Sequence, residues 1–227
     1  MFALFVHDLE SPLASMKYVL KMLEQGRLDL KNPRHRQLVS SSHIAVARAE
    51  AILYDSIAVA KSGAMGMKAN LVSVDLNTVL SEAATLAEGA AAEMGISISV
   101  TLPAKSMTVQ ADPLLLARTL DNLIYNGIRH TPEKGTVHIG CSEENGLAVI
   151  QIRDSGAGLG DINPEELFDK YGQINLRLQG KHRGVGLGLY FCRLASEAMN
   201  GRVSASNHAN GGALFSIYLH KSGGIKS

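Results

Sequence analysis

The segment DPLLLARTLDNLIYNGIRHTP, residues 112–132, combines the signals of a long helix with a cluster of polar side chains. Asp112 comes directly before Pro113, which is the order typical of a helix N-cap followed by the first helical residue. The helix is expected to end at about His130, because the residue before a proline disfavours helical backbone. The sequence therefore predicts one long helix with a defined beginning and end.

This helix carries two asparagines on one face, since Asn122 and Asn126 are four residues apart. Arg129 and His130 follow one turn later. Amide oxygens can ligate a hard cation such as Mg²⁺, and a guanidinium can pair with phosphate oxygens. The alternative is an ordinary polar helix face without a ligand.

The chain around this helix predicts an α+β domain, with helices on one face of a mixed sheet in an α/β sandwich. Two further helices are expected at residues 164–170 and 187–199, and an alanine-rich helix capped by Asp75 or Asn77 is expected to reach Ala92. Short strands are expected at residues 71–74, 96–102, 107–110, 135–141, 147–153, 203–207 and 213–219.

Residues 2–25 and 34–60 predict two long helices joined by a short loop. Their apolar stripes consist of Leu4, Leu9, Leu13, Met16, Leu20 and Leu23 in the first helix, and of Leu38, His43 or Ile44, Ala45, Ala49, Ile52, Leu53, Ile57 and Ala60 in the second. A hairpin cannot bury both stripes by itself. We therefore expect a homodimer through residues 2–60 that forms a four-helix bundle.

The expected organisation is a helical hairpin over residues 1–62, a hinge over residues 63–70 and the α+β domain over residues 71–227. The hinge carries glycines and no periodic apolar pattern.

The segment DSGAGL, residues 154–159, follows a predicted strand. Gly156 and Gly158 allow tight backbone turns. A buried carboxylate at a strand end, here Asp154, can accept a hydrogen bond from an exocyclic amine such as that of adenine. The alternative is a glycine-rich turn with a solvated Asp154.

The segment GVGLGL, residues 184–189, precedes a predicted helix. The absence of side chains at Gly184, Gly186 and Gly188 lets backbone amides approach an anion at a helix N-terminus. The spacing fits neither a P-loop nor a dinucleotide-binding fingerprint.

Near the N-terminus, VHDLESPL at residues 6–13 places His7 and Ser11 on one helical face, four residues apart. Asp8 can orient the histidine ring and leave the other ring nitrogen free to attack. Pro12 is expected to bend or loosen the helix. The alternative is a surface histidine on an amphipathic helix.

The composition excludes several classes of protein. A net charge of +1 and an aromatic content of 5% give no support for nucleic-acid binding. No apolar run is long enough for a membrane span. The two cysteines have no metal-ligand spacing, and a cytoplasmic location is expected.

In combination these motifs resemble the sensor histidine kinases of two-component systems. The resemblance covers a dimerisation and histidine-phosphotransfer hairpin followed by a Bergerat-type ATP-binding domain. The H, N, G1 and G2 boxes of that family have candidates in the four segments above, and the F box has a candidate in residues 167–171.

The resemblance implies a role for each residue of these boxes. His7 would be the phosphoacceptor, Asp8 the assisting acid, and Ser11 the residue tied to dephosphorylation of a response regulator. The residues that would bind ATP and Mg²⁺ are Asn122, Asn126 as the metal ligand, Arg129, His130, Asp154, Gly156, Gly158, Lys181, Arg183, Gly184, Gly186 and Gly188. Residues 159–183 would form a mobile lid. The partners would be a second copy of the chain and a receiver domain.

Three residues depart from the family pattern. Glu10 stands where a basic residue is common, and Ser11 stands where threonine or asparagine is typical, which concerns phosphatase activity more than kinase activity. Gly127 replaces the usual alanine, at a cost in helix stability of about 1 kcal/mol. Two alternative functions remain open: a non-catalytic nucleotide-binding scaffold, and an ATPase clamp of the gyrase or Hsp90 type.

Overall fold

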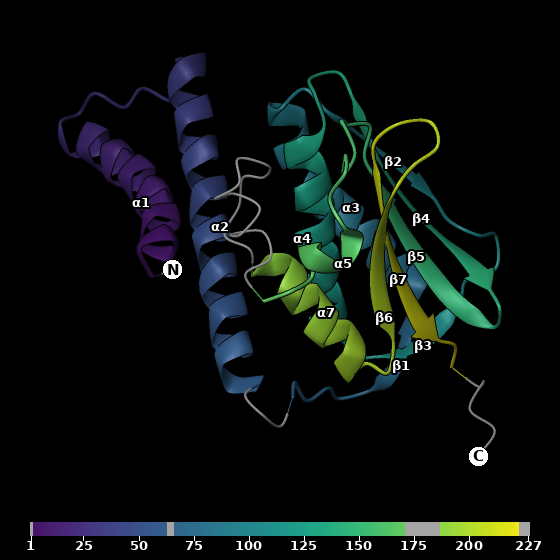
Figure 1. The fold of residues 1–227 in the computed structure, drawn as a ribbon. Helices are drawn as coiled ribbons and strands as arrows, with labels where there is room; N and C mark the ends of the chain where they lie inside the picture. The colour runs from purple at the N-terminus through teal and green to yellow at the C-terminus, as the bar shows by residue number, and fades with distance from the viewer. Residues whose placement is uncertain (1, 63–65, 171–186, 223–227) are drawn as a thin grey trace.

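The computed structural model describes residues 2–62, 66–170 and 187–222, and for residues 2–12, 44, 47, 48, 51, 52, 61 and 62 it describes the backbone alone. Two long helices, α1 (Phe2–Glu24) and α2 (Pro33–Ser62), form the predicted hairpin. An α+β domain follows. Figure 1 shows that α2 lies between α1 and this domain.

The α+β domain contains a mixed five-stranded sheet in the order β2-β4-β5-β7-β6. Its strands are β2 (Ser97–Thr101), β4 (Thr136–Glu144), β5 (Leu147–Arg153), β6 (Arg202–Asn207) and β7 (Ala213–His220). Strand β2 runs parallel to β4, and the other neighbouring pairs are antiparallel. The two remaining strands, β1 (Val72–Asp75) and β3 (Thr108–Ala111), pair in a separate two-stranded sheet that the sequence analysis did not predict.

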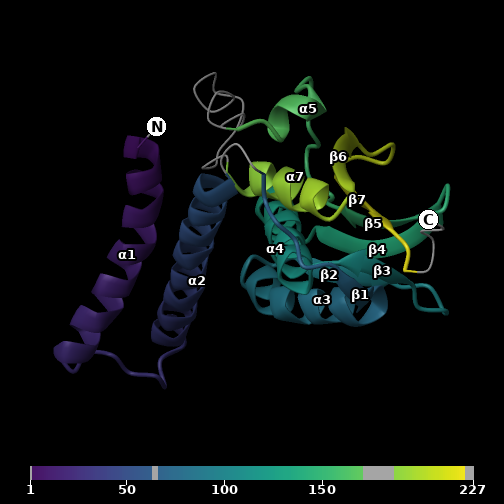
Figure 2. The ribbon, with the colours of Figure 1, turned by 90° about the horizontal axis from the view of Figure 1, so that it is seen from below.

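Three helices cover one face of the five-stranded sheet: α3 (Leu76–Glu93), α4 (Pro113–His130) and α7 (Gly188–Ala198). Figure 2 shows α4 and α7 between α2 and the sheet, with α3 beside α4 and below the sheet in this view. The short helix α5 (Pro164–Leu167) lies beside this layer. Large side chains of the core with less than 2% exposure include Leu116, Leu120, Leu123, Ile124, Ile139, Ile150 and Phe191.

Helix α4 begins as its sequence predicts. The Asp112 carboxylate accepts hydrogen bonds from the backbone N–H groups of Leu114 and Leu115, at 3.0 and 3.1 Å. Its other oxygen accepts one from the Asn70 backbone N–H, at 2.9 Å. The cap therefore satisfies orphan donors of the first turn and also ties the segment before β1 to α4.

The predicted apolar stripe of α2 is not fully buried within one chain. The buried side chains of this helix include Ser42, Ala49, Asp55 and Val59, whereas Leu53 and Ile57 are 43% and 54% exposed. Helix α2 contacts α1 and α7, and among the described residues the Leu53 and Ile57 side chains stay largely exposed. In the predicted bundle a second chain would cover them.

Strand β2 has the position that the sequence predicts, but its side chains are mostly exposed. It is an edge strand, and Val100 is 41% exposed although Ile98 packs against the core. Alternation along the sequence cannot tell an edge strand from a central one, because both keep the same period of two.

No described helix has the length and apolar character that crossing a membrane requires.

Two leucines of α4 give a matched test of this architecture, because Leu120 is fully buried and Leu114 is 75% exposed. Leu120→Ala is expected to lower the unfolding free energy by about 2–5 kcal/mol through the lost contacts and the cavity. Leu114→Ala is expected to change it by less than about 0.5 kcal/mol. Urea unfolding followed by circular dichroism measures both variants, and equal effects would contradict the placement of α4.

Candidate functional site

Three of the predicted motifs meet along α4. A Cβ atom added to Gly127 would lie 3.8 Å from Asp154 Cβ, and one added to Gly156 would overlap the His130 carbonyl oxygen. Asn122 lies about one turn before Gly127 on α4. A Cβ atom added to Gly188 of α7 would lie 2.9 Å from Asn122 Oδ1. The turn after β5 and the N-terminus of α7 therefore both contact the polar part of α4.

Asp154 is buried at the end of β5, with 3% exposure. Its Oδ1 atom accepts hydrogen bonds from the backbone N–H groups of Gly156, at 2.8 Å, and Ala213, at 3.1 Å. Within the described residues no hydrogen bond is made to its Oδ2 atom. The carboxylate is thus held by one oxygen, and the other oxygen remains able to accept a hydrogen bond from a ligand.

Asn207 on β6 holds the turn that follows Asp154. Its Oδ1 accepts from the Leu159 backbone N–H at 2.7 Å, and its Nδ2 donates to the Gly160 carbonyl at 3.1 Å. Gly158 has a φ of +76°, and a Cβ there would lie 2.6 Å from Asn207 Oδ1. The sequence analysis missed Asn207, because nothing local links it to a turn 48 residues earlier.

Gly212 is a second residue that the sequence analysis missed. It has a φ of +83°, and a Cβ atom would overlap the Asp154 carbonyl oxygen and lie 2.7 Å from its carbonyl carbon. The adjacent Gly211 has a similar φ of +88° but open space around it. A pair of glycines before a strand was the available signal, although the sequence does not show which of them faces Asp154.

The remaining predicted residues of α4 lie between these two contacts. Asn126 is partly buried, and no described residue forms a hydrogen bond with its side chain. Arg129 is partly buried, and its Nη2 lies 3.1 Å from His130 Nε2. Asn126, Arg129 and His130 are thus grouped near the end of α4, next to the Asp154 turn.

Asn122 does not point into open space, because α2 engages it. Its Nδ2 donates to Asp55 Oδ2 at 3.2 Å, and Arg118 Nε donates to Asp55 Oδ1 at 3.0 Å. Burial raises the pKa of the Asp55 carboxyl above its ordinary value, although the Arg118 guanidinium opposes that change. The sequence analysis missed both Asp55 and Arg118; an acidic residue within the apolar pattern of α2 was the only signal.

The glycine at position 127 has a structural reason. A Cβ atom there would lie 3.3 Å from Val137 Cγ1, which is a tight contact between α4 and β4. Glycine lowers the stability of the helix itself, but the absence of a side chain lets α4 pack closely against β4.

The other predicted residues lie partly outside the described residues. His7, Asp8 and Ser11 belong to α1, and only their backbone is described. Lys181, Arg183, Gly184 and Gly186 fall outside the described residues. Gly188 is the first residue of α7.

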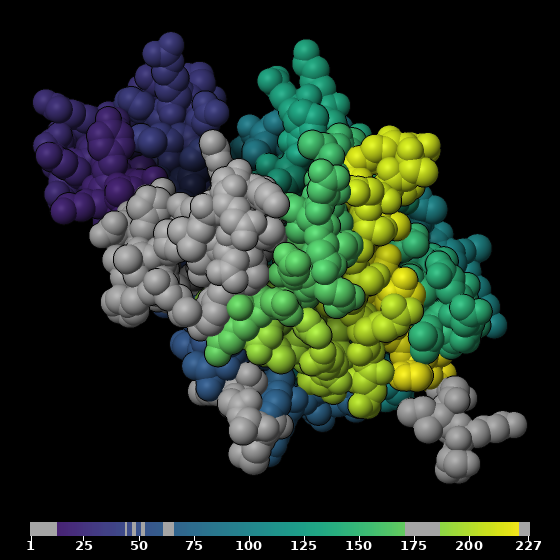
Figure 3. Space-filling model, viewed as in Figure 1, coloured from purple at the N-terminus to yellow at the C-terminus, as the bar shows by residue number. Residues whose placement is uncertain are grey.

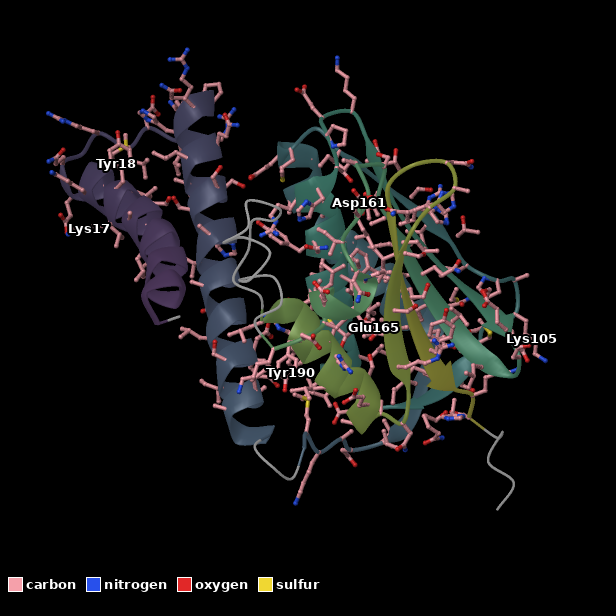
Figure 4. The ribbon with its side chains drawn as sticks, in the orientation of Figure 1. Lys17, Tyr18, Lys105, Asp161, Glu165 and Tyr190 are labelled. Carbon is pink, nitrogen blue, oxygen red and sulfur yellow. The ribbon has the colours of Figure 1, made fainter. Side chains whose placement is uncertain are left out.

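The predicted lid begins too early. Leu159, Leu167 and Phe168 are part of the hydrophobic core, and the Phe168 ring meets the Phe215 ring edge-on with centroids 6.4 Å apart. Apolar side chains in this segment therefore anchor residues 159–168 to the domain. Figure 4 shows Asp161 and Glu165 on this segment near α5. The rest of the predicted lid, from residue 171, lies outside the described residues.

Comparison with known families matches residues 111–223 to the family described as histidine kinase-, DNA gyrase B-, and HSP90-like ATPase. This range includes α4, the Asp154 turn and α7.

Curated relatives match almost the whole chain. The sensor protein KdpD of Clostridium acetobutylicum is 28% identical over 218 residues, which are 95% of this chain and 24% of the relative. The adaptive-response sensory kinase SasA of a Synechococcus strain is 26% identical over 223 residues, which are 96% of this chain and 58% of the relative. The chain thus spans between about a quarter and three fifths of the length of these two relatives.

Solved structures confirm the fold of both parts. The full-length ShkA structure, solved in complex with AMPPNP, has a TM-score of 0.66 at 23% identity and covers 94% of this chain and 46% of that one. The Acinetobacter baumannii histidine kinase AdeS has a TM-score of 0.63 at 19% identity, with 94% and 97% of the two chains covered.

Gly211 and Gly212 provide a matched test of the contact with Asp154. Gly211→Ala is expected to lower the unfolding free energy by about 1–2 kcal/mol, the cost of a positive φ in a residue with a Cβ atom. Gly212→Ala is expected to cost about 1–3 kcal/mol more, because its Cβ also collides with Asp154. Urea unfolding measures the difference, and identical midpoints for the two variants would contradict this geometry.

Proposed function

Because the chain belongs to the histidine kinase-, DNA gyrase B-, and HSP90-like ATPase family and is homologous with sensor histidine kinases over most of its length, we propose that it is the catalytic portion of a sensor histidine kinase. In this proposal ATP phosphorylates His7, and the phosphoryl group then passes to an aspartate on a response regulator.

The observation that carries the proposal is the setting of Asp154. A carboxylate with 3% exposure, held through Oδ1 by two backbone N–H groups, keeps Oδ2 available as an acceptor. The exocyclic amine of adenine is a donor of the matching kind. Asn126 and Arg129 lie on α4, which contacts the same turn through Gly127, so the phosphates would extend along this helix toward α7.

The residues of α4 also suit Mg²⁺. The Asn126 side chain is partly buried and has no described hydrogen-bond partner, and an amide oxygen is a hard ligand of the kind that Mg²⁺ accepts. When bound, Mg²⁺ would neutralise charge on the ATP phosphates. Arg129 would pair with the phosphate oxygens, and the backbone N–H groups at the start of α7 would receive the same anionic groups.

In the proposed reaction a ring nitrogen of His7 attacks the γ-phosphorus of ATP. The bond from that phosphorus to the β–γ bridging oxygen breaks, and ADP leaves. The aligned geometry and the neutralised charge would supply most of the catalysis, as is general for phosphoryl transfer. Asp8 would orient the His7 ring. Since His7 lies on the hairpin, the ATP-binding domain has to move relative to α1, and we assign that movement to the hinge at residues 63–70.

We also propose that the hairpin forms a homodimer. Leu13, Leu20 and Leu23 of α1 are 50–59% exposed, and Leu53 and Ile57 of α2 are also exposed. Figure 3 shows the hairpin standing at one side of the ATP-binding domain. A second hairpin would cover these side chains in a four-helix bundle. A cytoplasmic location suits the two free thiols, Cys141 and Cys192.

A labelling experiment tests His7 as the phosphoacceptor. Incubation with γ-labelled ATP is expected to give a protein label that is stable in base and labile in acid, because the label is a phosphohistidine. His7→Gln is expected to abolish the label. His43→Gln, at an exposed histidine of α2, is the matched control and is expected to retain it.

Two other outcomes of this experiment have distinct meanings. A label that persists in His7→Gln would exclude His7 as the acceptor. Binding of a fluorescent ATP analogue without any protein label in the unaltered chain would favour the non-catalytic scaffold instead.

A mass measurement tests the dimer. The double variant Leu13→Glu with Leu20→Glu is expected to be monomeric at micromolar concentration, because charges replace apolar side chains in the proposed interface. Leu86→Glu is the control, since Leu86 is 78% exposed on α3 of the ATP-binding domain. Light scattering after size-exclusion chromatography measures the mass. A monomeric unaltered chain would show that the bundle does not form.

A further inference from the structure

The contact between α2 and the ATP-binding domain contains an ion pair between a buried carboxylate and a partly buried guanidinium. Asp55 lies on α2 with 3% exposure, and its two oxygens accept from Arg118 Nε at 3.0 Å and Asn122 Nδ2 at 3.2 Å. Both partners lie on α4, one turn apart. A single carboxylate of the hairpin is therefore tied to the helix that carries the proposed Mg²⁺ ligand.

Aromatic side chains close this contact on one side. The Tyr54 ring lies 5.9 Å from the Arg118 guanidinium carbon, and it meets the Phe191 ring of α7 edge-on with centroids 6.4 Å apart. The Cys192 thiol of α7 is buried next to this contact. Its burial raises the pKa of the thiol, and the negative charge of Asp55 raises that pKa further. Figure 4 shows Tyr190 on α7 at the side that faces α2.

The ion pair also lies at the N-terminus of α7. A Cβ atom at Gly188 would lie 2.9 Å from Asn122 Oδ1 and 3.8 Å from Asp55 Oδ2. The start of a helix favours negative charge. Asp55 thus brings a carboxylate to a helix end that, in the proposed function, receives the phosphates of ATP.

Two features reduce the stabilisation that the Asp55–Arg118 ion pair can provide. Arg118 Nη2 is buried and has no hydrogen-bond partner among the described residues. Asp121, the neighbour of Asn122, repels Asp55 electrostatically. A buried ion pair with unsatisfied donors gains little over its separated, hydrated partners. The contact is therefore suited to opening and closing rather than to permanent closure.

We infer that Asp55, Arg118 and Asn122 form an interdomain latch, in which the Asp55 carboxylate holds α2 against α4 and α7 and engages the Asn122 amide in place of a nucleotide phosphate. Closing the latch holds the ATP-binding domain against α2, and opening it releases both the domain and Asn122. The effect on phosphorylation rests on the proposed function, whereas the effect on docking does not.

The chemistry of a buried pair gives variants with opposite expectations. Asp55→Leu leaves the Arg118 charge facing an apolar side chain, and Arg118→Met leaves the Asp55 charge without its partner. Either charge is hydrated if the two parts separate, so each single variant is expected to undock. The double variant replaces both charges by apolar side chains of similar size and is expected to stay docked.

Docking is measured by single-molecule energy transfer between dyes on unnatural amino acids at Glu50 of α2 and Glu88 of α3, both exposed. Labelled chain is diluted into excess unlabelled chain, so that the transfer reports distances within one chain. The ratio of docked to undocked molecules is expected to fall at least about tenfold in each single variant. It is expected to return to the original value or above it in the double variant.

Lys221→Met is the matched control, because it removes an ion pair with Glu143 whose partners are 34% and 49% exposed. Its docking ratio is expected to stay unchanged, since an exposed pair contributes little. Tyr54→Ala provides a second route, because it removes the ring over Arg118 without changing a charge, and it is expected to reduce docking as well.

The labelling reaction with γ-labelled ATP separates this inference from the proposed function. Faster initial labelling in both single variants, by at least about threefold, together with undocking, supports the latch and its effect on ATP. Undocking in a chain that never labels supports the latch and overturns the kinase proposal. Single variants that label normally and dock as the unaltered chain does would overturn the latch.

Discussion

The rest of the structure depends on the two-sided packing of α4. One face of this helix buries Leu116, Leu120 and Leu123 against the core, so the helix cannot rotate without exposing them. That constraint determines where its polar face points. Asn122 is directed to α2 and the start of α7, while Gly127 and His130 contact the turn after β5. One helix therefore connects both glycine-rich segments with the hairpin.

Close backbone approach is the second requirement of the site. At Gly156 and Gly212 a single added carbon would overlap a backbone oxygen of a neighbouring segment. The turn after β5, the end of α4 and the start of β7 are thus packed around Asp154 at distances that only glycine permits. Asn207 completes the arrangement by pairing with backbone groups of Leu159 and Gly160, the two residues that follow Gly158. The position of the carboxylate is a property of the whole sheet edge rather than of one turn.

The hairpin shows how an exposed surface and a buried charge can occur on one helix. Figure 2 shows α1 on one side of α2 and the ATP-binding domain on the other. The Asp55 side of α2 is closed by α4 and α7, whereas Leu53 and Ile57 stay exposed. The same helix therefore offers an apolar face suited to a second chain and a carboxylate paired within its own chain. This division places the proposed dimer and the proposed latch on different surfaces.

The sequence alone was sufficient to predict the helices, most strand positions and the cap at Asp112, because these follow from local propensity, capping and spacing. It left the cap of α3 open between Asp75 and Asn77, and in the structure Asp75 is the cap. It did not predict the separate sheet of β1 and β3, the edge position of β2, or the pairing of Asn122 with Asp55. Those features depend on contacts between residues far apart in the chain. Local sequence contains no information on which strand lies at an edge or which helix face another element covers, so only the tertiary structure decides them.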